Sequence, residues 1–274
     1  SADVDKLVLF AFFILILQIL VFLSYYVYCR INYKEAKGTE KYNKNVLREL
    51  LSFIGWTLTG SITNMCNGQG INILLNVFYG PTINAARGIA FQVQSVISNF
   101  CSNIQQAINP QITKTYASKE LDNMYSLLIL SSKVSYIFLL ILSIPVYFET
   151  DIILSLWLGE YPSYTVDFIR IVLFINLLEA TSSPLITANH ATGDIKRFQI
   201  TVESIMILAL PMSYIYLKYI DSSYPGAVYV ILLLVAFVGQ IARIVIVLPN
   251  IGMKFVFYVK SVLLPLFNIS SKRS

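Results

Sequence analysis

A series of apolar runs, each long enough to cross a lipid bilayer, constrains the fold of this chain more than any other feature. A membrane-spanning helix needs about 20 mostly apolar residues. Seven runs reach that length, and they predict spans at residues 7–29, 50–78, 86–109, 123–147, 165–188, 198–218 and 225–248. Only 13% of the residues are charged, whereas soluble domains carry about 25%. The sequence therefore predicts an all-α integral membrane protein.

Strings of proline, glycine and polar residues separate these runs. "YGPTINAARG" lies between the second and third runs, "NPQITKTYASKELDN" between the third and fourth, and "ETDIILSLWLGEYPSY" between the fourth and fifth. Proline removes a backbone donor and glycine permits positive φ, so both favour helix ends. We expect turns or loops at these strings.

The charges of successive connections predict an orientation. Residues 30–49 are rich in Lys and Arg, whereas residues 148–165 contain neither and carry Glu149, Asp151 and Glu160. Cytoplasmic loops of membrane proteins carry an excess of Lys and Arg. The pattern predicts that the first helix begins outside the cell and that residues 30–49 are cytoplasmic.

Polar side chains recur at helical spacing in and around the third run. Residues 84–114 read "NAARGIAFQVQSVISNFCSNIQQAINPQITK". At 3.6 residues per turn, these side chains form two neighbouring rows along the helix, which we call the stripe and the strip. The stripe contains Gly88, Gln92, Ser95, Asn99, Asn103 and Gln106, and the strip contains Arg87, Gln94, Ser98 and Gln105. The opposite face is apolar.

Two interpretations of this polar half remain open. Lipid cannot hydrogen-bond to an amide, so the polar half must face other helices or water. The amides either bond across the helix bundle or line a hydrated cavity. We favour the cavity, because so many polar groups on one helix exceed what helix contacts require.

The second run repeats the pattern. Thr57, Gly60, Asn64 and Asn67 share one arc, and Asn72 and Asn76 emerge on a shifted face after Gly68 and Gly70. The two glycines either allow close packing of helices or form a bend. Two consecutive polar helices predict a shared cavity.

Three ionisable residues within or near the spans complete the predicted site. Arg87 and Arg170 lie toward the outer side, where they either attract a phosphate or extend to the interface. Glu179 lies near mid-span and either pairs with a buried cation, which we favour, or takes part in ion coupling. The predicted cavity residues are Asn64, Asn67, Asn72, Asn76, Arg87, Gln92, Ser95, Asn99, Asn103, Gln106, Arg170 and Glu179.

No motif indicates an enzyme, a cofactor or a metal site. The chain has no glycine-rich nucleotide loop and no nucleophile elbow, and its single histidine, His190, excludes a multi-histidine metal centre within the chain. The basic residues are scattered over short loops, so nucleic acid is not expected as a partner. We expect no catalytic residues and no cofactor.

Several strings resemble a known family. "GPTINAARGIA" (80–90), "NPQITKTYAS" (109–118), "ETDIILSLWLGEYPSYTVDFIRIVL" (149–173) and "PLITANHATGDIKRFQI" (184–200) are similar to polysaccharide biosynthesis exporters. These are O-antigen and capsule repeat-unit flippases of the multidrug/oligosaccharidyl-lipid/polysaccharide exporter superfamily. The resemblance covers roughly residues 7–260.

The resemblance implies a V-shaped protein of two six-helix lobes. On that pattern residues 1–29 hold the last helix of the first lobe and residues 30–49 the cytoplasmic linker. Residues 50–248 would form the second lobe, and residues 249–274 a cytoplasmic interfacial segment or a truncated helix. The rest of the first lobe, which would lie outside this sequence, is then an expected partner.

The resemblance also implies a function. Its members move undecaprenyl-diphosphate-linked oligosaccharides across the bacterial inner membrane by alternating access. Expected partners are this lipid-linked substrate, membrane lipid and the polysaccharide polymerase machinery. Two alternatives stay open: a cation-coupled multidrug antiporter of the same superfamily, which predicts aromatic and acidic cavity groups, and a scaffold that transports nothing.

Overall fold

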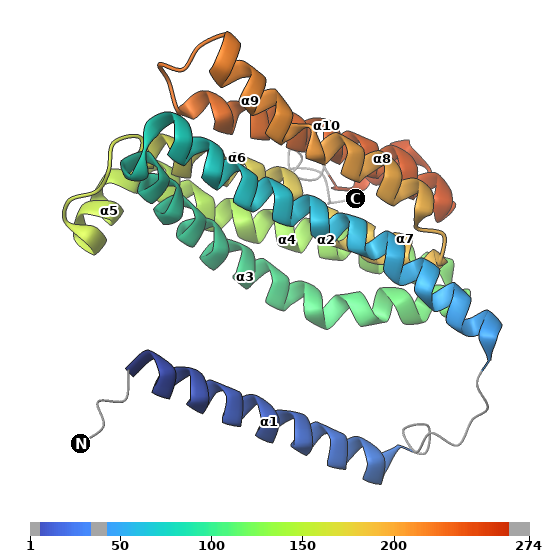
Figure 1. The fold of residues 1–274 in the computed structure, drawn as a ribbon. Coiled ribbons are helices and arrows are strands. Elements are labelled where there is room, and N and C mark those ends of the chain that lie inside the picture. Colours follow the sequence, from blue (N-terminus) through green and yellow to red (C-terminus); the bar gives the residue numbers. More distant parts are fainter. Residues whose placement is uncertain (1–5, 34–42, 263–274) are drawn as a thin grey trace, which may run out of the picture. The chain divides into compact units, whose positions relative to one another are not determined.

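The computed structural model describes residues 6–33 and 43–262, and every secondary-structure element in this part of the chain is a helix (Figure 1). The chain forms two compact units, Ser1–Glu49 and Leu50–Ser274, which are described separately. The predicted all-α class is confirmed for the described residues.

The first unit contains helix α1, Lys6–Asn32. The stretch Val8–Asn32 is long and apolar enough to cross a membrane. The helix is apolar along almost its whole length, as a membrane-spanning helix requires. Residues 34–42, most of the predicted linker, lie outside the described residues.

The second unit is a helix bundle. Helix α3 packs against α4, α6 and α7, and helix α10 packs against α6, α7 and α8. The elements are α2 (Lys44–Tyr79), α3 (Pro81–Ala117), α4 (Leu121–Phe148), α5 (Thr150–Leu158), α6 (Thr165–Glu179), α7 (Ser182–Thr192), α8 (Lys196–Ile207), α9 (Ala209–Tyr219), α10 (Gly226–Asn250) and α11 (Phe255–Val262).

Five segments of the described chain are long and apolar enough to span a membrane: Val8–Asn32, Leu121–Phe148, Thr165–Thr192, Lys196–Tyr219 and Gly226–Asn250. The protein is therefore a multi-pass membrane protein. Helices α2 and α3 are longer, at 36 and 37 residues, and at about 1.5 Å per residue each exceeds a hydrocarbon core of about 30 Å. Their polar side chains keep them out of the apolar set, so the count of seven stays a prediction.

Each of the three predicted connections contains a break between helices, but helices occupy more of the three strings than expected. Helix α3 begins at Pro81, directly after Gly80 with φ +80°, because proline suits the first turn of a helix, where its missing N–H is not needed. The same helix continues through Pro110 to Ala117. Helix α5 occupies much of the predicted loop 148–165.

The predicted spans 165–188 and 198–218 are each interrupted. Helix α6 gives way to α7 at Ala180, and α8 gives way to α9 at Leu208. Pro184 has no N–H, so it cannot bond to the carbonyl of Ala180. The side chain of Gln105 donates to that carbonyl instead, at 3.3 Å. The amide of Asn67 likewise donates to the carbonyl of Met206, beside the second break, at 2.9 Å.

The core contains two large apolar clusters with polar side chains between them, and a third, small cluster around Ala209. One cluster contains Phe168, which stacks on Tyr229 at 4.3 Å between ring centroids. The other contains Phe198 and Met124. Along each contributing helix, buried polar residues lie between the two clusters in sequence. We call these residues the polar layer: Gln105, Ser135, Thr181, Ser182, Gln240 and Arg243.

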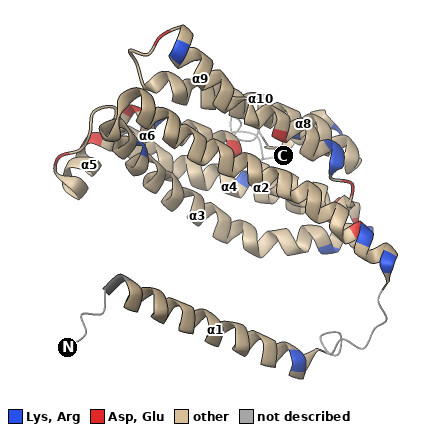
Figure 2. Cartoon of the chain, in the orientation of Figure 1, with Lys and Arg blue, Asp and Glu red and all other residues tan. Residues whose placement is uncertain are grey.

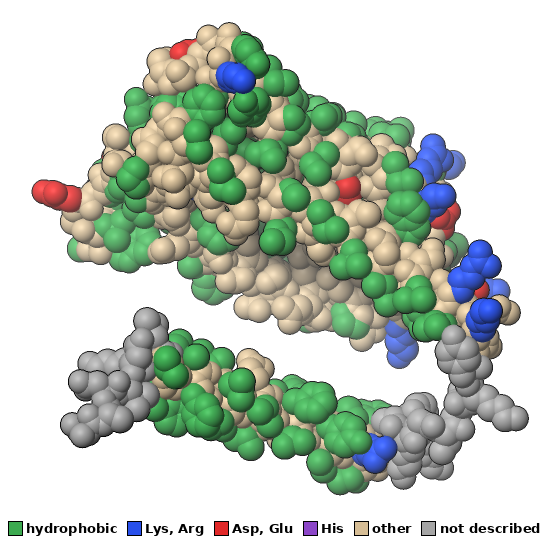
Figure 3. Space-filling model, viewed as in Figure 1, with side chains coloured by type: hydrophobic (Ala, Val, Ile, Leu, Met, Phe, Trp, Pro, Cys, Tyr) green, Lys and Arg blue, Asp and Glu red, His purple; other side chains and the backbone are tan. Residues whose placement is uncertain are grey.

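Charged side chains gather at the ends of the bundle (Figures 2 and 3). Lys114 and Lys119 lie at the end of α3, and Lys196 and Arg197 begin α8. The connection around α5 is acidic. Charged residues are rare in membrane-spanning segments, and most of the surface between the two ends of the bundle is uncharged in Figure 3.

Replacing Gln105 by leucine tests its role at the break. In Gln105→Leu the carbonyl of Ala180 and the hydroxyl of Ser135 lose a donor, which should cost about 1–3 kcal/mol of unfolding free energy. Thermal unfolding in detergent micelles, followed by circular dichroism, should show a lower midpoint. Gln106→Leu is the matched control, because Gln106 is exposed. This variant should unfold near the midpoint of the parent protein. Equal midpoints for the two variants would contradict the assignment.

Candidate functional site

A polar chamber of about 340 Å³ lies within the second unit, among α2, α3, α6, α8 and α10. Asn64 and Asn67 reach it from α2, Arg87 and Gln94 from α3, and Glu179 from α6. Aromatic and aliphatic side chains complete the walls. The chamber therefore combines a cation, a carboxylate and amides inside an apolar bundle.

The guanidinium of Arg87 is held from α2. Its Nε donates to Asn72 Oδ1 at 2.5 Å, and its Nη2 donates to the carbonyl of Gly68 at 2.8 Å. Arg87 lies in the second turn of α3, which begins at Pro81 just after α2 ends, so the turn at Gly80 brings the two helices together. A guanidinium has five N–H donors, so donors remain for a ligand in the chamber.

The carboxylate of Glu179 lies 3.9 Å from Arg243 Nη1 on α10. The predicted pairing of Glu179 with a buried cation is confirmed. Arg243 Nη1 also donates to Ser182 Oγ at 3.0 Å. Ser182 donates to Gln240, which donates in turn to Thr181. The pair is therefore connected to the polar layer at the break between α6 and α7.

Two amide atoms near the chamber have no protein partner. Asn67 Oδ1 and Asn176 Nδ2 are buried without a hydrogen bond, although each side chain uses its other end: Asn67 donates to Met206 and Asn176 accepts from Gln94. Buried polar atoms are nearly always bonded to protein or to ordered water. The chamber is therefore suited to water or to a polar ligand.

The stripe on α3 lies on a different surface. Gln92, Asn99, Asn103 and Gln106 are exposed on the outside of the bundle, and Ser95 is half-buried beside Asn99. The neighbouring strip faces inward, where Gln94 donates to Asn176 and Gln105 to Ser135. The inner strip therefore fits the first interpretation, amides that bond across the helix bundle. The outer stripe forms no bonds to the other described helices of the second unit, so the hydrated cavity stays open as its interpretation.

The chamber contains only part of the predicted cavity. Four predicted residues line the chamber: Asn64, Asn67, Arg87 and Glu179. Asn72 supports Arg87, while Asn76 is exposed on α2 and the stripe lies outside. A helical wheel identifies which residues share a face, but it cannot tell which of two neighbouring polar faces turns toward the bundle.

Arg170 does not line the chamber either. Its Nε donates to the carbonyl of Tyr147 at 3.3 Å, its Nη2 lies 3.5 Å from Asp151 Oδ2, and its guanidinium lies over the Tyr147 ring. Tyr161 donates to Asp151 Oδ1 at 3.1 Å, and this hydrogen bond raises the pKa of Tyr161. Arg170 therefore connects α4, α5 and α6. It does not share the chamber with Arg87, where the two were expected to attract a phosphate.

Sequence reasoning missed other residues of the chamber. Gln94 was placed on the neighbouring strip, and only its contact with Asn176 shows that this strip faces inward. Tyr229 and Met206 also line the chamber. Both lie in apolar runs, where nothing in the local pattern distinguishes a cavity wall from a core residue.

Comparison with protein-family models, curated proteins and solved structures finds no match to this chain. Within residues 6–33 and 43–262, no three His, Cys, Asp or Glu side chains are grouped so that they could hold a metal ion. The chemistry that the described site offers is hydrogen bonding by amides, with one cation and one carboxylate held in place.

A double-mutant cycle tests the Glu179–Arg243 pair. Glu179→Gln, Arg243→Gln and the double variant should show a coupling of about 1–3 kcal/mol, because the partners share one network. Arg243→Gln should be the less stable single variant, since it also removes the hydrogen bond from Arg243 to Ser182 Oγ. Chemical unfolding in micelles measures all three. Additive losses would show that the two groups act independently.

Proposed function

We propose that this chain contains the last helix of the first lobe and the second lobe of a membrane transporter that moves a lipid-linked oligosaccharide across the bilayer by alternating access. The observation that carries the proposal is the exposed amide stripe on α3. Sugar hydroxyls require donors and acceptors, and amides supply both. The resemblance to polysaccharide exporters supports the same substrate class.

We infer that the stripe does not face lipid. An unsatisfied polar group in hydrocarbon costs several kcal/mol, so a helix that crosses the bilayer does not turn exposed amides toward acyl chains. Gln92, Asn99 and Asn103 are exposed among the described residues of the second unit, and the amide of Asn99 donates only to Ser95 of its own helix, at 3.5 Å. Water and a glycan in a cavity would satisfy them, with a first lobe forming the opposite wall.

The interrupted helices support movement of the bundle. In transporters, broken helices at membrane depth commonly line the substrate or ion site. The break between α6 and α7 begins next to Glu179, and the break between α8 and α9 is bonded to Asn67. Both residues line the chamber. We infer that the chamber responds to bending at these breaks and that Arg87 there binds the substrate diphosphate.

We further infer that α2 and α3 cross the bilayer with the five apolar segments. Seven spans, with α2–α10 forming the second lobe, account for the alternating loop charges. The basic ends of α3 and α8 then face the cytoplasm and α5 lies on the outer side. The bacterial inner membrane is the location that this substrate class implies.

A cation-coupled multidrug antiporter is the second candidate. The observation in its favour is the chamber itself, which contains Glu179 together with Phe91 and Tyr229. An acidic group surrounded by aromatic rings suits an organic cation. The exposed amides have no role in that mechanism.

Leucine substitutions in the stripe test the proposal in the complete protein. The variant Gln92→Leu/Asn99→Leu/Asn103→Leu removes three amides from the proposed glycan surface. Each lost hydrogen bond should weaken glycan binding by about 1 kcal/mol, a factor of about five. Surface glycan should fall and its lipid-linked precursor should accumulate inside the cell.

The matched control is Gln111→Leu, which removes an exposed amide from the same helix beyond the predicted span. Protein level in the membrane is measured for every variant. An undiminished amount of surface glycan in the triple variant would contradict the proposal. If Glu179→Gln abolishes cation-driven drug efflux while surface glycan stays normal, the antiporter is the better description.

A further inference from the structure

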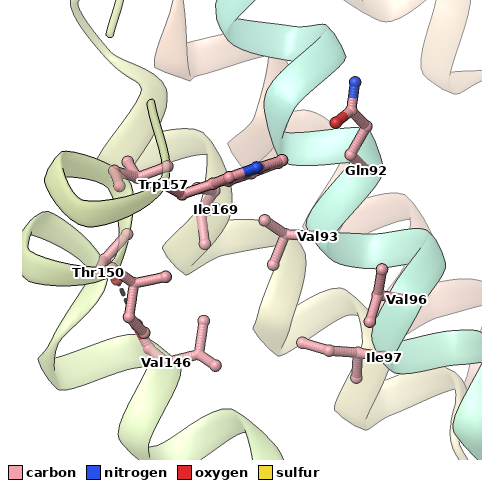
Figure 4. Close-up of a pocket in the computed structure, with 10 residues that line it drawn as sticks. Gln92, Val93, Val96, Ile97, Val146, Thr150, Trp157 and Ile169 are labelled. Carbon is pink, nitrogen blue, oxygen red and sulfur yellow. Dashed lines mark hydrogen bonds between the residues drawn. The ribbon is translucent and has the colours of Figure 1, made fainter. Parts of the chain in front are cut away.

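An apolar groove of about 320 Å³ lies between α3 and α5, separate from the chamber and from most of the stripe (Figure 4). Val93 and Val96 of α3 form one side, and Ile153 and Trp157 of α5 form the other. The indole of Trp157 extends from α5 toward α3 in Figure 4. The walls of the groove are almost entirely hydrocarbon.

The polar side chains of the groove offer little to a polar ligand. Thr150 donates its hydroxyl to the carbonyl of Val146, within its own stretch of chain. The amide of Gln92 turns away from the middle of the groove in Figure 4. A sugar or phosphate in the groove would lose its bonds to water without replacement, so the fitting occupant is apolar.

Helix α5 has the character of a helix that lies in a membrane surface. Leu156 is 88% exposed and Ile152 63% exposed, both on a helix of nine residues. Asp151 of the same helix bonds to Arg170 and Tyr161, which holds α5 against the bundle. Apolar side chains beside a tryptophan are typical of interfacial helices, since indole favours the boundary between lipid and water.

The groove opens at exposed apolar side chains. Val96 of α3 and Trp157 of α5, which line it from its two sides, are both half-exposed or more. Helix α4 is one of the membrane-spanning candidates; it contributes Val146 to the groove, while Ile141 and Phe148 are exposed on its other face. Hydrocarbon in contact with α5 therefore reaches the groove past apolar side chains.

We propose that the groove between α3 and α5 binds an acyl chain of a bilayer phospholipid, and that α5 is embedded in the leaflet at its end of the bundle. Trp157 covers this chain, and the bonds from Arg170 and Tyr161 to Asp151 keep the groove formed. This site does not depend on the transported substrate, so it stands or falls separately from the proposed function.

Fluorescence quenching by brominated phospholipids tests both statements. The chain contains two tryptophans, so Trp56→Phe leaves Trp157 as the only reporter. The full chain is reconstituted in phosphatidylcholine vesicles without polyprenyl lipid, with bromines near the carbonyl end, the middle or the methyl end of the acyl chains. Trp157 emission should fall most with bromines near the carbonyl end.

Two variants separate occupancy of the groove from contact with lipid at the surface of α5. Val96→Phe in the Trp56→Phe background fills the groove and should reduce the quenching of Trp157, and Ile153→Phe fills it from the other side. Val230→Phe, exposed on α10 outside the groove, is the matched control and should leave quenching unchanged. Circular dichroism confirms that each variant is folded.

A positive control comes from Ile141→Trp in a chain with both native tryptophans replaced by phenylalanine. Bromines in the bilayer must quench this lipid-facing residue. If they do so while Trp157 emission is unaffected, α5 is outside the hydrocarbon and the proposal is overturned. If Trp157 is quenched equally with and without the filling substitutions, lipid touches α5 but does not enter the groove, and the acyl-chain site is overturned.

Discussion

Hydrogen bonding of polar groups inside an apolar bundle governs the second unit. Pro184 leaves the carbonyl of Ala180 without its helical donor, and Gln105 supplies one. From that break the network runs through Thr181, Ser182 and Gln240 to Arg243, and Arg243 lies beside Glu179. The polar layer thus allows a span to be interrupted at mid-length, between two apolar clusters, because the freed carbonyl of Ala180 accepts from Gln105.

Helix α3 connects this internal constraint to function. Its inner strip joins the bundle, while its outer stripe presents amides that no described helix of the second unit covers. One helix therefore separates a structural polar network from an outward polar surface. The chamber, where Arg87 and Glu179 meet amides from α2, lies on the inner side of the same helix. In the proposed transporter, binding at the outer surface and bending at the breaks act on opposite faces of α3.

Sequence periodicity predicted the helical class and the apolar spans, because hydrophobic length is a property of single segments. It placed Gln92 and Asn103 on one face correctly, but it could not show that Gln94 and Gln105, one strip away, are the residues that turn inward. That choice depends on contacts with Asn176 and Ser135 from distant segments. The helix α5 was missed because it is shorter than a span and bounded by Gly159 and Glu149, which locally resemble a loop. The contact of Arg170 with Asp151 could not be predicted either, because Asp151 belongs to that helix.

Cysteine accessibility across α3 tests the central claim, that this helix has a hydrated side while it crosses the bilayer. The native cysteines, Cys29, Cys66 and Cys101, are first replaced by alanine, and Asn99→Cys, Asn103→Cys and Phe100→Cys are then compared in intact membranes. A charged maleimide reacts with thiolate in water and not with a thiol in hydrocarbon. Labelling at positions 99 and 103 but not at position 100 is the predicted result. Equal protection of all three positions would contradict the account.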